Sequence, residues 1–532
     1  MKYYRGILFA DEMKPYWVRV VPWAVLVLFA LSWLGFFSLM SPAAPGPDVF
    51  VFRDAGCNWA RGAGFVAASV PHGNTSHAKL FASYTPGAPL LFGVVASWLG
   101  CSGWVDTIYN LFFATVAVLL FYICFGWAVR SRRLRLWAAL LLGVLLPTGM
   151  VAFDNDRPEM PAFCLLVAIL LGWRKTASVS GRALLLGCVG LVFLIHPFAG
   201  IVGWFLVAFL LVFEEPRMLT GRLPVVLAGT ALYVLVVFGW LLSMWWQDAS
   251  AVRRFLEHAA GQGTGAGVIL HGVKTANAGG GPAVRNGYAV AYHQLFNPAF
   301  PASAALAASL LVCGLVVAVY AFREAGRARL RLQGVLLLTV FLIFPFAVFP
   351  GQTNYLGLAR AVLVVALLIG KFPLAGVLRE SGASFAFILI SFVFLAPWVA
   401  LEVLQNIEAR GSYFDARQQV RRVHDLFAAR GVSNPTLLVD SGHYFLYKPF
   451  FPNLYNRNYA EPGDASGLAQ GMLVCYSGTR AFSRAELPED EKLAAHGWKL
   501  IDGGEDAVHV TLFGHAVMRR NWTWMCDVYA RE

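Results

Sequence analysis

The stretch DVFVFRDAGCNWARGAGF, residues 48–65, places an arginine and an aspartate where the chain leaves its first long apolar run. Amphipathic segments beside the end of a membrane span can roof a cavity where a lipid-borne substrate meets a water-soluble group. A carboxylate in such a cavity can take a proton from an attacking hydroxyl. We therefore predict Asp54 as a catalytic base, and Arg53 as a substrate-binding residue that also holds this carboxylate ionised. The alternative is that Asp54 caps a short helix and Arg53 anchors at the lipid headgroups.

Residues 72–100 would supply the roof of this cavity. The turn Tyr84-Thr85-Pro86-Gly87 is followed by an apolar run of only about a dozen residues. About 20 apolar residues are needed to cross the hydrocarbon core of a bilayer, so this run should lie along the interface. We predict that Tyr84 contacts substrate, and that the glycines after Arg61 allow a tight turn.

A second group of charges lies in PTGMVAFDNDRPEMPAF, residues 147–163, at the predicted outer junction of two apolar helices. A charge costs about 2.5–3.5 kcal/mol at the centre of a membrane, so such residues usually face a polar cavity or the surface. A capping box with Asp156 as the N-cap and Glu159 three residues on is the structural alternative, and the two roles are compatible. The predicted substrate-binding residues here are Asp154, Asp156, Arg157 and Glu159.

Scattered polar residues at the predicted outer edge complete the candidates. Arg285 and His293 lie in a long loop, and Arg360 follows FPGQTNYLGLA. A guanidinium suits a phosphate because its planar fork makes two charge-assisted hydrogen bonds, and Arg360 fits this description best. We predict that all three bind substrate. His196, in LIHPFAG, belongs to the same group, and each residue taken singly also fits a packing or interfacial role.

The composition indicates what must position these residues. The chain has 532 residues, is 58% hydrophobic and only 14% charged, and its apolar runs are repeatedly long enough to cross a membrane. The net charge of +12 could indicate a nucleic-acid partner, but the basic residues lie in short clusters between apolar runs, such as Arg130–Arg135. Cytoplasmic loops of membrane proteins carry such clusters. We therefore predict a polytopic membrane protein with no nucleic-acid partner.

The expected architecture is a polytopic α-helical membrane domain over residues 1–401, with external loops at 41–104 and 247–297 and a cytoplasmic amino terminus. The first apolar run should be an uncleaved span. His196-Pro197 interrupts the apolar stretch 183–213, and a helix breaker there could separate two spans or kink one. With two spans there, the eleven predicted spans lie near residues 20–40, 105–129, 136–153, 158–173, 183–196, 198–213, 223–246, 298–321, 334–350, 359–372 and 383–401.

Residues 402–532 read as a small extracytoplasmic α/β domain. They contain the charged amphipathic stretch FDARQQVRRVHDLFAARG and the strand-like runs TLLVD, GMLVCYS and WKLID. Eight cysteines show no CxxC spacing, so no zinc or redox motif is predicted. Cys57 with Cys101, and Cys475 with Cys526, fall on the predicted oxidising side and could form disulfides, with free thiols throughout as the alternative.

With these features the chain resembles the GT-C superfamily of integral-membrane glycosyltransferases, which includes lipid A aminoarabinose transferases and protein O-mannosyltransferases. The resemblance covers the topology of the whole chain, but specific motifs cover only residues 48–100 and 147–163. The predicted first external loop, residues 41–104, lacks the adjacent Asp-Glu pair of the O-mannosyltransferases. Its Trp245-Trp246-Gln247-Asp248 also departs from the Trp-Trp-Asp of oligosaccharyltransferases, which argues against a protein acceptor.

The resemblance implies a sugar transferase that uses a polyprenyl-phosphate donor and a lipid or polysaccharide acceptor at the outer face of a bacterial inner membrane, among membrane lipids. By position, Asp54 matches the carboxylate that the superfamily carries in its first external loop, whereas Asp154 and Asp156 match the second loop equally well. A divalent metal could bridge Asp54 and a second-loop carboxylate, because hard oxygen ligands suit Mg²⁺ or Mn²⁺. The sequence does not require a cofactor, and we assign no residues as ligands of such a metal.

Two other classes of protein compete with a transferase. An ion- or proton-coupled transporter or flippase of envelope glycolipids would use Asp54, Asp156 and His196 as coupling residues. Such proteins usually place functional charges near the midplane, on broken helices in repeat-related halves, whereas these residues lie at the predicted outer edge. A membrane scaffold or ligand sensor would leave the charged edges at 48–61 and 154–159 unexplained.

Overall fold

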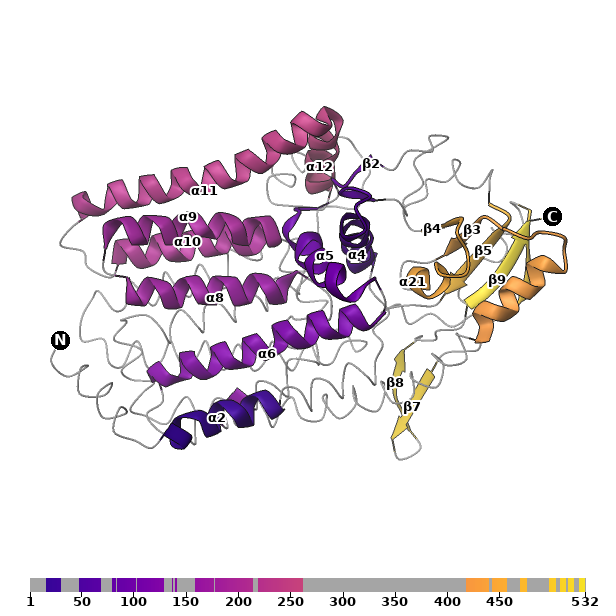
Figure 1. The fold of residues 1–532 in the computed structure, drawn as a ribbon, viewed down its shortest axis with the longest axis horizontal. Helices are drawn as coiled ribbons and strands as arrows, with labels where there is room; N and C mark the ends of the chain where they lie inside the picture. Colours follow the sequence, from indigo (N-terminus) through magenta and orange to yellow (C-terminus); the bar gives the residue numbers. More distant parts are fainter. Residues whose placement is uncertain are drawn as a thin grey trace.

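The computed structural model describes residues 16–29, 47–67, 79–128, 158–213, 219–261, 418–439, 443–456, 469–475 and 497–531, apart from short gaps, together with 136 and 139–140. Figure 1 shows long helices side by side, short helices across one end of this bundle, and a β-sheet beyond them. The predicted spans from 298 to 401, and most of the one at 136–153, lie outside the described residues.

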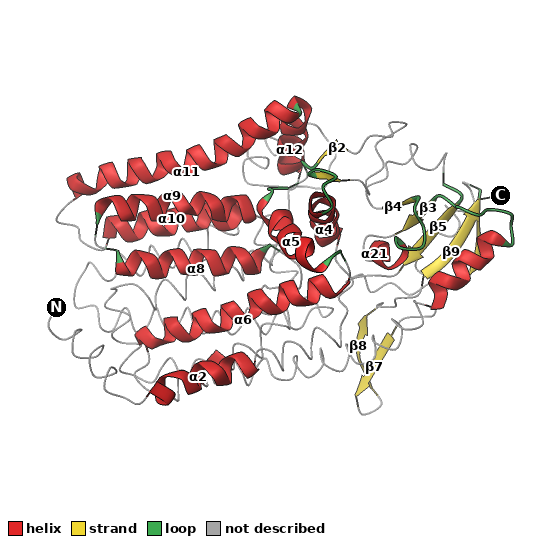
Figure 2. Ribbon diagram, in the orientation of Figure 1, coloured by secondary structure: helices red, strands yellow, loops and turns green. Residues whose placement is uncertain are grey.

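The bundle consists of helices that the apolar runs of the sequence predict. The predicted spans 105–129, 158–173 and 223–246 are confirmed as helices. Among the described residues, Leu223–Gln247 is the one helical segment both long and apolar enough to cross a membrane, with a mean hydropathy of 2.4, and shorter apolar helices accompany it. The bundle helices in Figures 1 and 2 are α2 (Tyr16–Phe29), α6 (Gly103–Ala128), α8 (Glu159–Lys175), α9 (Val179–Ile195), α10 (Pro197–Phe213) and α11 (Leu219–Gln247).

The apolar stretch 183–213 forms two helices rather than one kinked helix. Helix α9 ends at Ile195 and α10 begins at Pro197. A Cβ added to Gly200 would clash with the Cα of Phe193, and one added to Gly203 would lie 3.1 Å from Val189. The first pair lies close to the break at Pro197, and the second pair lies about one turn further from it in both helices. Helix α10 therefore folds back along α9. The helix breaker therefore makes a hairpin, with His196 at its tip.

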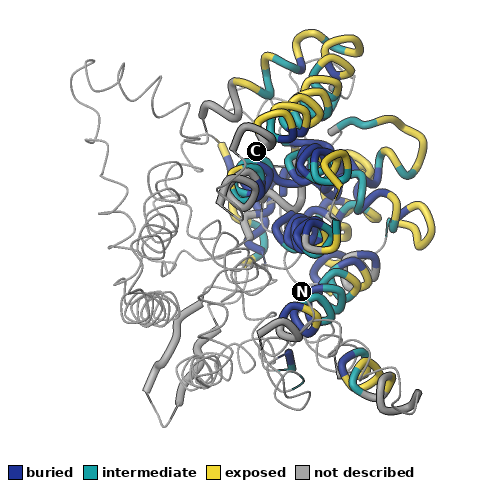
Figure 3. Tube along the Cα trace, turned by 90° about the vertical axis from the view of Figure 1, so that its left-hand side faces the viewer, coloured by how far each residue is buried: buried dark blue, intermediate teal, exposed yellow. Residues whose placement is uncertain are grey.

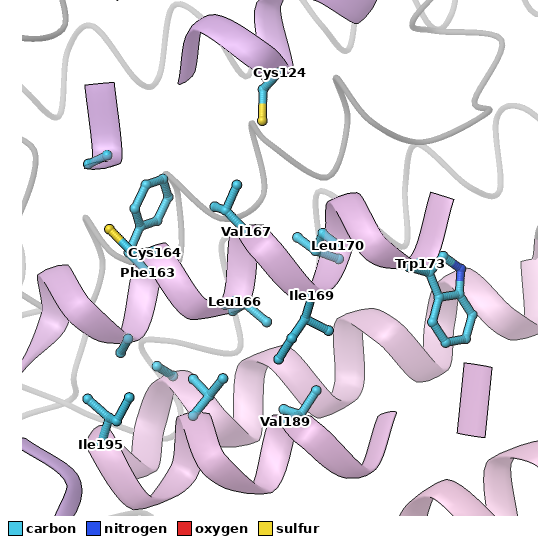
Figure 4. Packing of buried hydrophobic residues seen from close by; sticks show 14 of the residues in the cluster. Cys124, Phe163, Cys164, Leu166, Val167, Ile169, Leu170, Trp173, Val189 and Ile195 are labelled. Carbon is cyan, nitrogen blue, oxygen red and sulfur yellow. The ribbon is translucent and has the colours of Figure 1, made fainter. Parts of the chain in front are cut away.

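Side chains from several helices form one apolar core inside the bundle. Phe163, Leu166 and Leu170 of α8 are almost fully buried in this core, and Figure 4 shows them beside Val189 and Ile195 of α9. The tube in Figure 3 shows the same pattern, with buried residues on the inner side of the helices and exposed residues on the outer side. Leu227, Leu235 and Phe238 of α11 are more than half exposed, as expected of a surface that faces lipid.

Small residues allow α9 and α11 to approach closely. A Cβ added to Gly187 of α9 would lie 2.6 Å from Leu232 of α11. In the reverse direction, a Cβ on Gly229 of α11 would lie 2.7 Å from Leu186 of α9. Glycine at such contacts is typical of helix pairs in membranes, where close van der Waals packing replaces the hydrophobic effect.

Short elements cover the end of the bundle that the sequence predicts to be external. Helices α4 (Pro47–Ala60) and α5 (Gly87–Leu99) are joined through the antiparallel strands β1 (Val66–Ala67) and β2 (Lys79–Leu80). In Figure 1 the axes of both helices lie at a steep angle to the axes of the bundle helices. Helix α5 has 13 residues, so the predicted apolar run is confirmed as a helix too short to span. Helix α12 (Ala249–Gly261) lies beside them, and its Arg254 donates to the Leu80 carbonyl at 3.3 Å.

The carboxyl-terminal part contains the predicted sheet and helix. The three predicted strands are confirmed as β3 (Leu437–Val439), β5 (Gly471–Cys475) and β6 (Trp498–Asp502). The amphipathic stretch is a helix at 418–428, and its Val420, Val423 and Phe427 are buried with residues of the sheet. The other elements are α21 (Tyr444–Tyr447), β4 (Leu454–Asn456), β7 (Val508–Leu512), β8 (His515–Arg520) and β9 (Cys526–Arg531).

The five-stranded sheet has the order β4-β3-β5-β9-β6. Strand β3 is parallel to β4 and β5, whereas β9 is antiparallel to β5 and β6. The register places Cys475 opposite Cys526, and Cys526 is disulfide-bonded. Strands β7 and β8 form a separate hairpin.

Candidate functional site

Asp54 lies within α4, and this helix is fixed against α5. A Cβ added to Gly56 would come within 2.5 Å of the Pro89 carbonyl oxygen, so the two backbones are in close contact. A disulfide between Cys57 and Cys101, with 5.8 Å between their Cα atoms, ties α4 to the chain just after α5. This predicted disulfide is confirmed. The alternative in which Asp54 caps a helix is wrong, because α4 continues on both sides of it.

The side chains of Arg53 and Asp54 are buried, with 7% and 5% of their surfaces exposed. The Arg53 guanidinium lies over the ring of Phe92 on α5, with 5.9 Å between its carbon and the ring centroid. Asn58 donates from Nδ2 to Oδ1 of Asp54 at 3.3 Å and to the Val66 carbonyl at 2.9 Å. Successive side chains on a helix point about 100° apart, so the arginine and the aspartate face different elements.

The turn after α4 is the tight one that the glycines predict. Gly62 and Gly64 have φ values of 74° and 91°, in the region that residues with a side chain rarely adopt. The turn returns the chain to β1, and Phe81, just after β2, donates its backbone N–H to the Phe65 carbonyl at 2.9 Å. The first external segment therefore folds back on itself beside Asp54.

The carboxyl-terminal part packs against the same helix. Phe52 and Ala55, on either side of Asp54, belong to one buried cluster with Tyr444 and Tyr447 of α21. Lys448 directly follows α21, and its Nζ lies 5.6 Å from the centroid of the Tyr444 ring. This ammonium also donates to the Pro452 carbonyl at 2.8 Å. Segments far apart in the sequence thus meet around Asp54.

Asp54 is within electrostatic reach of two of these residues. Burial raises the pKa of Tyr444 well above its usual range, and the Asp54 carboxylate raises it further. Burial lowers the pKa of Lys448, an effect that Asp54 opposes and Arg61 reinforces. A carboxylate beside a cation and a phenol can accept a proton from a substrate hydroxyl while the cation compensates negative charge.

Helix α4 also contacts the turn that carries Tyr84. The Tyr84 ring is 5.0 Å from that of Phe52 and 6.1 Å from the imidazole of His196, measured between centroids. His196 is itself 1% exposed, and its Nε2 lies 3.6 Å from Oε1 of the fully buried Glu159. Of the predicted binding residues, the structure therefore brings Arg53, Tyr84 and Glu159 into one region with Asp54.

The predicted capping box is wrong. Helix α8 has Pro158 as its N-cap and Glu159 as its first residue, two positions too late for Asp156 to be the cap. The Glu159 carboxylate lies beside His196. The remaining predicted substrate-binding residues, which lie outside the described part of the chain, are Asp154, Asp156, Arg157, Arg285, His293 and Arg360.

Two residues near Asp54 were not predicted from the sequence. Tyr444 and Lys448 come from a region that reads as a separate soluble domain, and no motif marks them. His196 was noted but not assigned to the site, and the break at Pro197 could have placed it at a helix end facing the first external segment. No three His, Cys, Asp or Glu side chains in the described ranges gather to hold a metal, and a metal shared with Asp154 or Asp156 stays a prediction.

The chain has the fold of the GT-C class of integral-membrane transferases, so the predicted resemblance is confirmed at the level of the fold. A crystal structure of ArnT from Cupriavidus metallidurans bound to undecaprenyl phosphate matches 97% of this chain and 98% of its own, with a TM-score of 0.53 and 14% identity. The apo ArnT structure from the same organism matches 96% and 98%, with a TM-score of 0.52 and 15% identity.

A third structure, an oligosaccharyltransferase from Archaeoglobus fulgidus tethered to an acceptor peptide, has a TM-score of 0.42 and 10% identity over 87% of this chain and 69% of its own. No protein-family model and no curated protein sequence matches the chain.

Proposed function

We propose that this protein is a membrane glycosyltransferase. It moves a sugar from a polyprenyl-phosphate donor to the hydroxyl of a lipid or polysaccharide acceptor at the outer face of the membrane, with Asp54 as the general base. The observation that carries the proposal is the buried Asp54 carboxylate, which lies where α4, the end of the bundle and the carboxyl-terminal sheet meet. ArnT, which has this fold, was crystallised with undecaprenyl phosphate, and that supports a lipid-phosphate donor.

The reaction would be a single displacement. The acceptor oxygen attacks the anomeric carbon while its proton passes to an Asp54 carboxylate oxygen. The bond from the anomeric carbon to the phosphate oxygen breaks, and its electron pair leaves with the lipid phosphate. Attack opposite the leaving group inverts the anomeric carbon.

The surroundings of Asp54 fit these roles. Arg53 faces Phe92 of α5, the short apolar helix expected to lie along the membrane interface. A cation there can compensate the charge that develops on the departing phosphate. The predicted cations Arg157, Arg285 and Arg360 would add to this stabilisation.

The test is sugar transfer by the purified protein in detergent, with a panel of polyprenyl-phosphate sugars and an envelope lipid extract. Asp54→Asn should lower kcat by about 10²–10⁴-fold, the usual contribution of a positioned base. Donor binding and the unfolding temperature should stay at their wild-type values. Asp425→Asn, which removes the same charge from a side chain that is 82% exposed, is the matched control and should be fully active.

The outcomes test the role of Asp54 separately from the transferase activity itself. Transfer by Asp54→Asn at the wild-type rate would show that Asp54 is not the base. Failure of the wild type to consume any donor would favour the transporter or flippase instead.

A further inference from the structure

Glu159 and His196 form a buried polar pair at the end of the bundle nearest Asp54. Glu159 opens α8, and His196 occupies the tip of the hairpin between α9 and α10. Their side chains are 0% and 1% exposed, and the Nε2 to Oε1 distance is 3.6 Å. The adjacent residues are apolar: Phe198 and Ala199 are buried in the core of the bundle.

The hydrogen bonds around His196 define its orientation. The backbone N–H of Ala199 donates to Nδ1 at 3.2 Å, so Nδ1 is the acceptor nitrogen of the ring. The imidazole proton is then on Nε2, which faces Glu159. The backbone thus fixes one edge of the ring, and the Glu159 carboxylate attracts the other.

The same ring supports the turn that carries Tyr84. The rings of Tyr84 and His196 meet edge to face, with an interplanar angle of 80°. Gly87 lies three residues after Tyr84, and a Cβ added to it would come within 2.6 Å of the Leu194 carbonyl oxygen. The turn therefore packs directly against the end of α9. Tyr84 then contacts Phe52, two residues before Asp54.

We propose that Glu159 and His196 are positioning residues for the transfer reaction, which hold Tyr84 and, through it, the segment of α4 that carries Asp54. The pair touches no reacting atom and acts through a continuous series of contacts from Glu159 to His196, Tyr84 and Phe52. This inference rests on the proposed function for its effect on rate, and on the contacts alone for its effect on the structure.

A role in stability alone would not require this pair. Replacing both members of a buried polar pair by apolar residues of similar size is often nearly neutral, whereas removing one partner is costly. The double variant Glu159→Leu/His196→Phe removes both polar groups and keeps an aromatic ring against Tyr84. Glu159→Gln is the conservative variant, because it keeps the size of the side chain and an oxygen that can face the Nε2 proton.

Two measurements test the proposal. The first is sugar transfer: the double variant should lose at least tenfold in kcat with the KM for donor unchanged, and Glu159→Gln should stay within about threefold of wild type. The second is amide hydrogen exchange in the full chain, where α4 and residues 79–100 should exchange at least tenfold faster in the double variant. Ile169→Ala is the control for general destabilisation, since Ile169 is buried on the same helix away from the pair.

Each result has a defined meaning. Unchanged exchange of α4 in the double variant, or wild-type kcat, would overturn the proposal. An equal rise in α4 exchange in Ile169→Ala would also overturn it, because the effect would then be general. If exchange rises only in the double variant and wild type transfers no sugar, the positional coupling stands and the proposed function fails.

Discussion

Asp54 and Glu159 are both buried carboxylates on helices at the same end of the molecule, with 5% and 0% of their surfaces exposed. Their surroundings differ. Asp54 lies between elements from three parts of the chain and is in electrostatic reach of Lys448 and Tyr444. Glu159 directly precedes residues of α8 that pack in the apolar core of the bundle, and its carboxylate lies 3.6 Å from Nε2 of His196.

The difference shows how the environment divides roles between similar residues. A carboxylate beside an ammonium and a phenol at a junction of elements can meet a substrate and exchange a proton. A carboxylate enclosed in an apolar core is costly unless it is satisfied, and it then fixes the geometry of its partner. We therefore expect substitutions around Asp54 to change the chemical step, and those around Glu159 to act through position.

The largest effect after loss of Asp54 itself should come from displacing α4. In Gly56→Ala the new methyl group would meet the Pro89 carbonyl at 2.5 Å, so α4 must shift away from α5. A misplacement of about 1 Å can cost about 10²-fold in rate, and overpacking typically costs about 1–3 kcal/mol. We expect a fall in kcat of about 10–100-fold in the transfer assay.

Gly239→Ala is the control for this change. Gly239 is a helical glycine of α11, and a Cβ added there meets nothing within 4 Å. Alanine is favoured over glycine in a helix by about 0.5–1 kcal/mol, so this variant should be fully active and no less stable. Equal activity in both variants would show that the reaction does not depend on the contact between α4 and α5.

A smaller effect is expected when Lys448 is replaced by methionine. The Asp54 carboxylate and the Lys448 ammonium attract each other, and this attraction favours the ionised carboxylate. Removing the ammonium should move the acid limb of the kcat profile to higher pH, because the carboxylate loses a charge that favours its ionised form. The measurement is kcat as a function of pH. At pH 7 the kcat of Lys448→Met should fall by less than about tenfold relative to wild type.

Lys448→Arg keeps the positive charge and is the matched control. Its acid limb should coincide with that of wild type. A profile that is identical in Lys448→Met and wild type would mean that the carboxyl-terminal part covers Asp54 without acting on it. That result would mean that the charge of Lys448 does not distinguish the surroundings of Asp54 from those of Glu159.

The fold was predictable where a segment carries its own signal. Apolar runs predicted α6, α8 and α11, and alternating or β-branched residues predicted β3, β5 and β6. Helix α4 was not predicted, because its mixed sequence of charged, small and apolar residues has no clear period. It is held by tertiary contacts, including the disulfide and the close approach to α5.

The candidate site was predictable only in part. Asp54, Arg53 and Tyr84 stand in one unusual stretch of sequence, so position along the chain revealed them. Glu159 and His196 are separated in the sequence by the length of α8 and α9, and each has an ordinary explanation when taken alone. Lys448 follows a short helix of the external sheet, and only the folded chain brings it to α4.

The smallest effect is expected at Asp248, an acidic residue at the same end of the bundle. Unlike Asp54, it is not buried, and it does not lie at a junction of several elements. It accepts from the Ser250 backbone N–H at 2.9 Å at the start of α12, and from Arg254 at 2.9 Å. Hydrogen bonds from Ser250 and Arg254, and the charge of Arg254, lower its pKa from 3.8 to about 2. This stabilisation is present above pH 3.8 and is lost as the pH falls towards 2.

Asp248→Asn keeps a good N-cap and removes only the charge, so it should cost less than about 1 kcal/mol at pH 7, as is usual for exposed ion pairs. The unfolding temperatures of the variant and of wild type should converge as the pH falls towards 2, where the carboxyl is protonated. Sugar transfer should be unchanged. Asp248→Ala also removes the cap and should cost about 1 kcal/mol more. If Asp248→Asn instead lowered kcat as far as Asp54→Asn does, burial at the junction would not be what distinguishes a catalytic carboxylate here, and the contrast drawn between Asp54 and Glu159 would lose its basis.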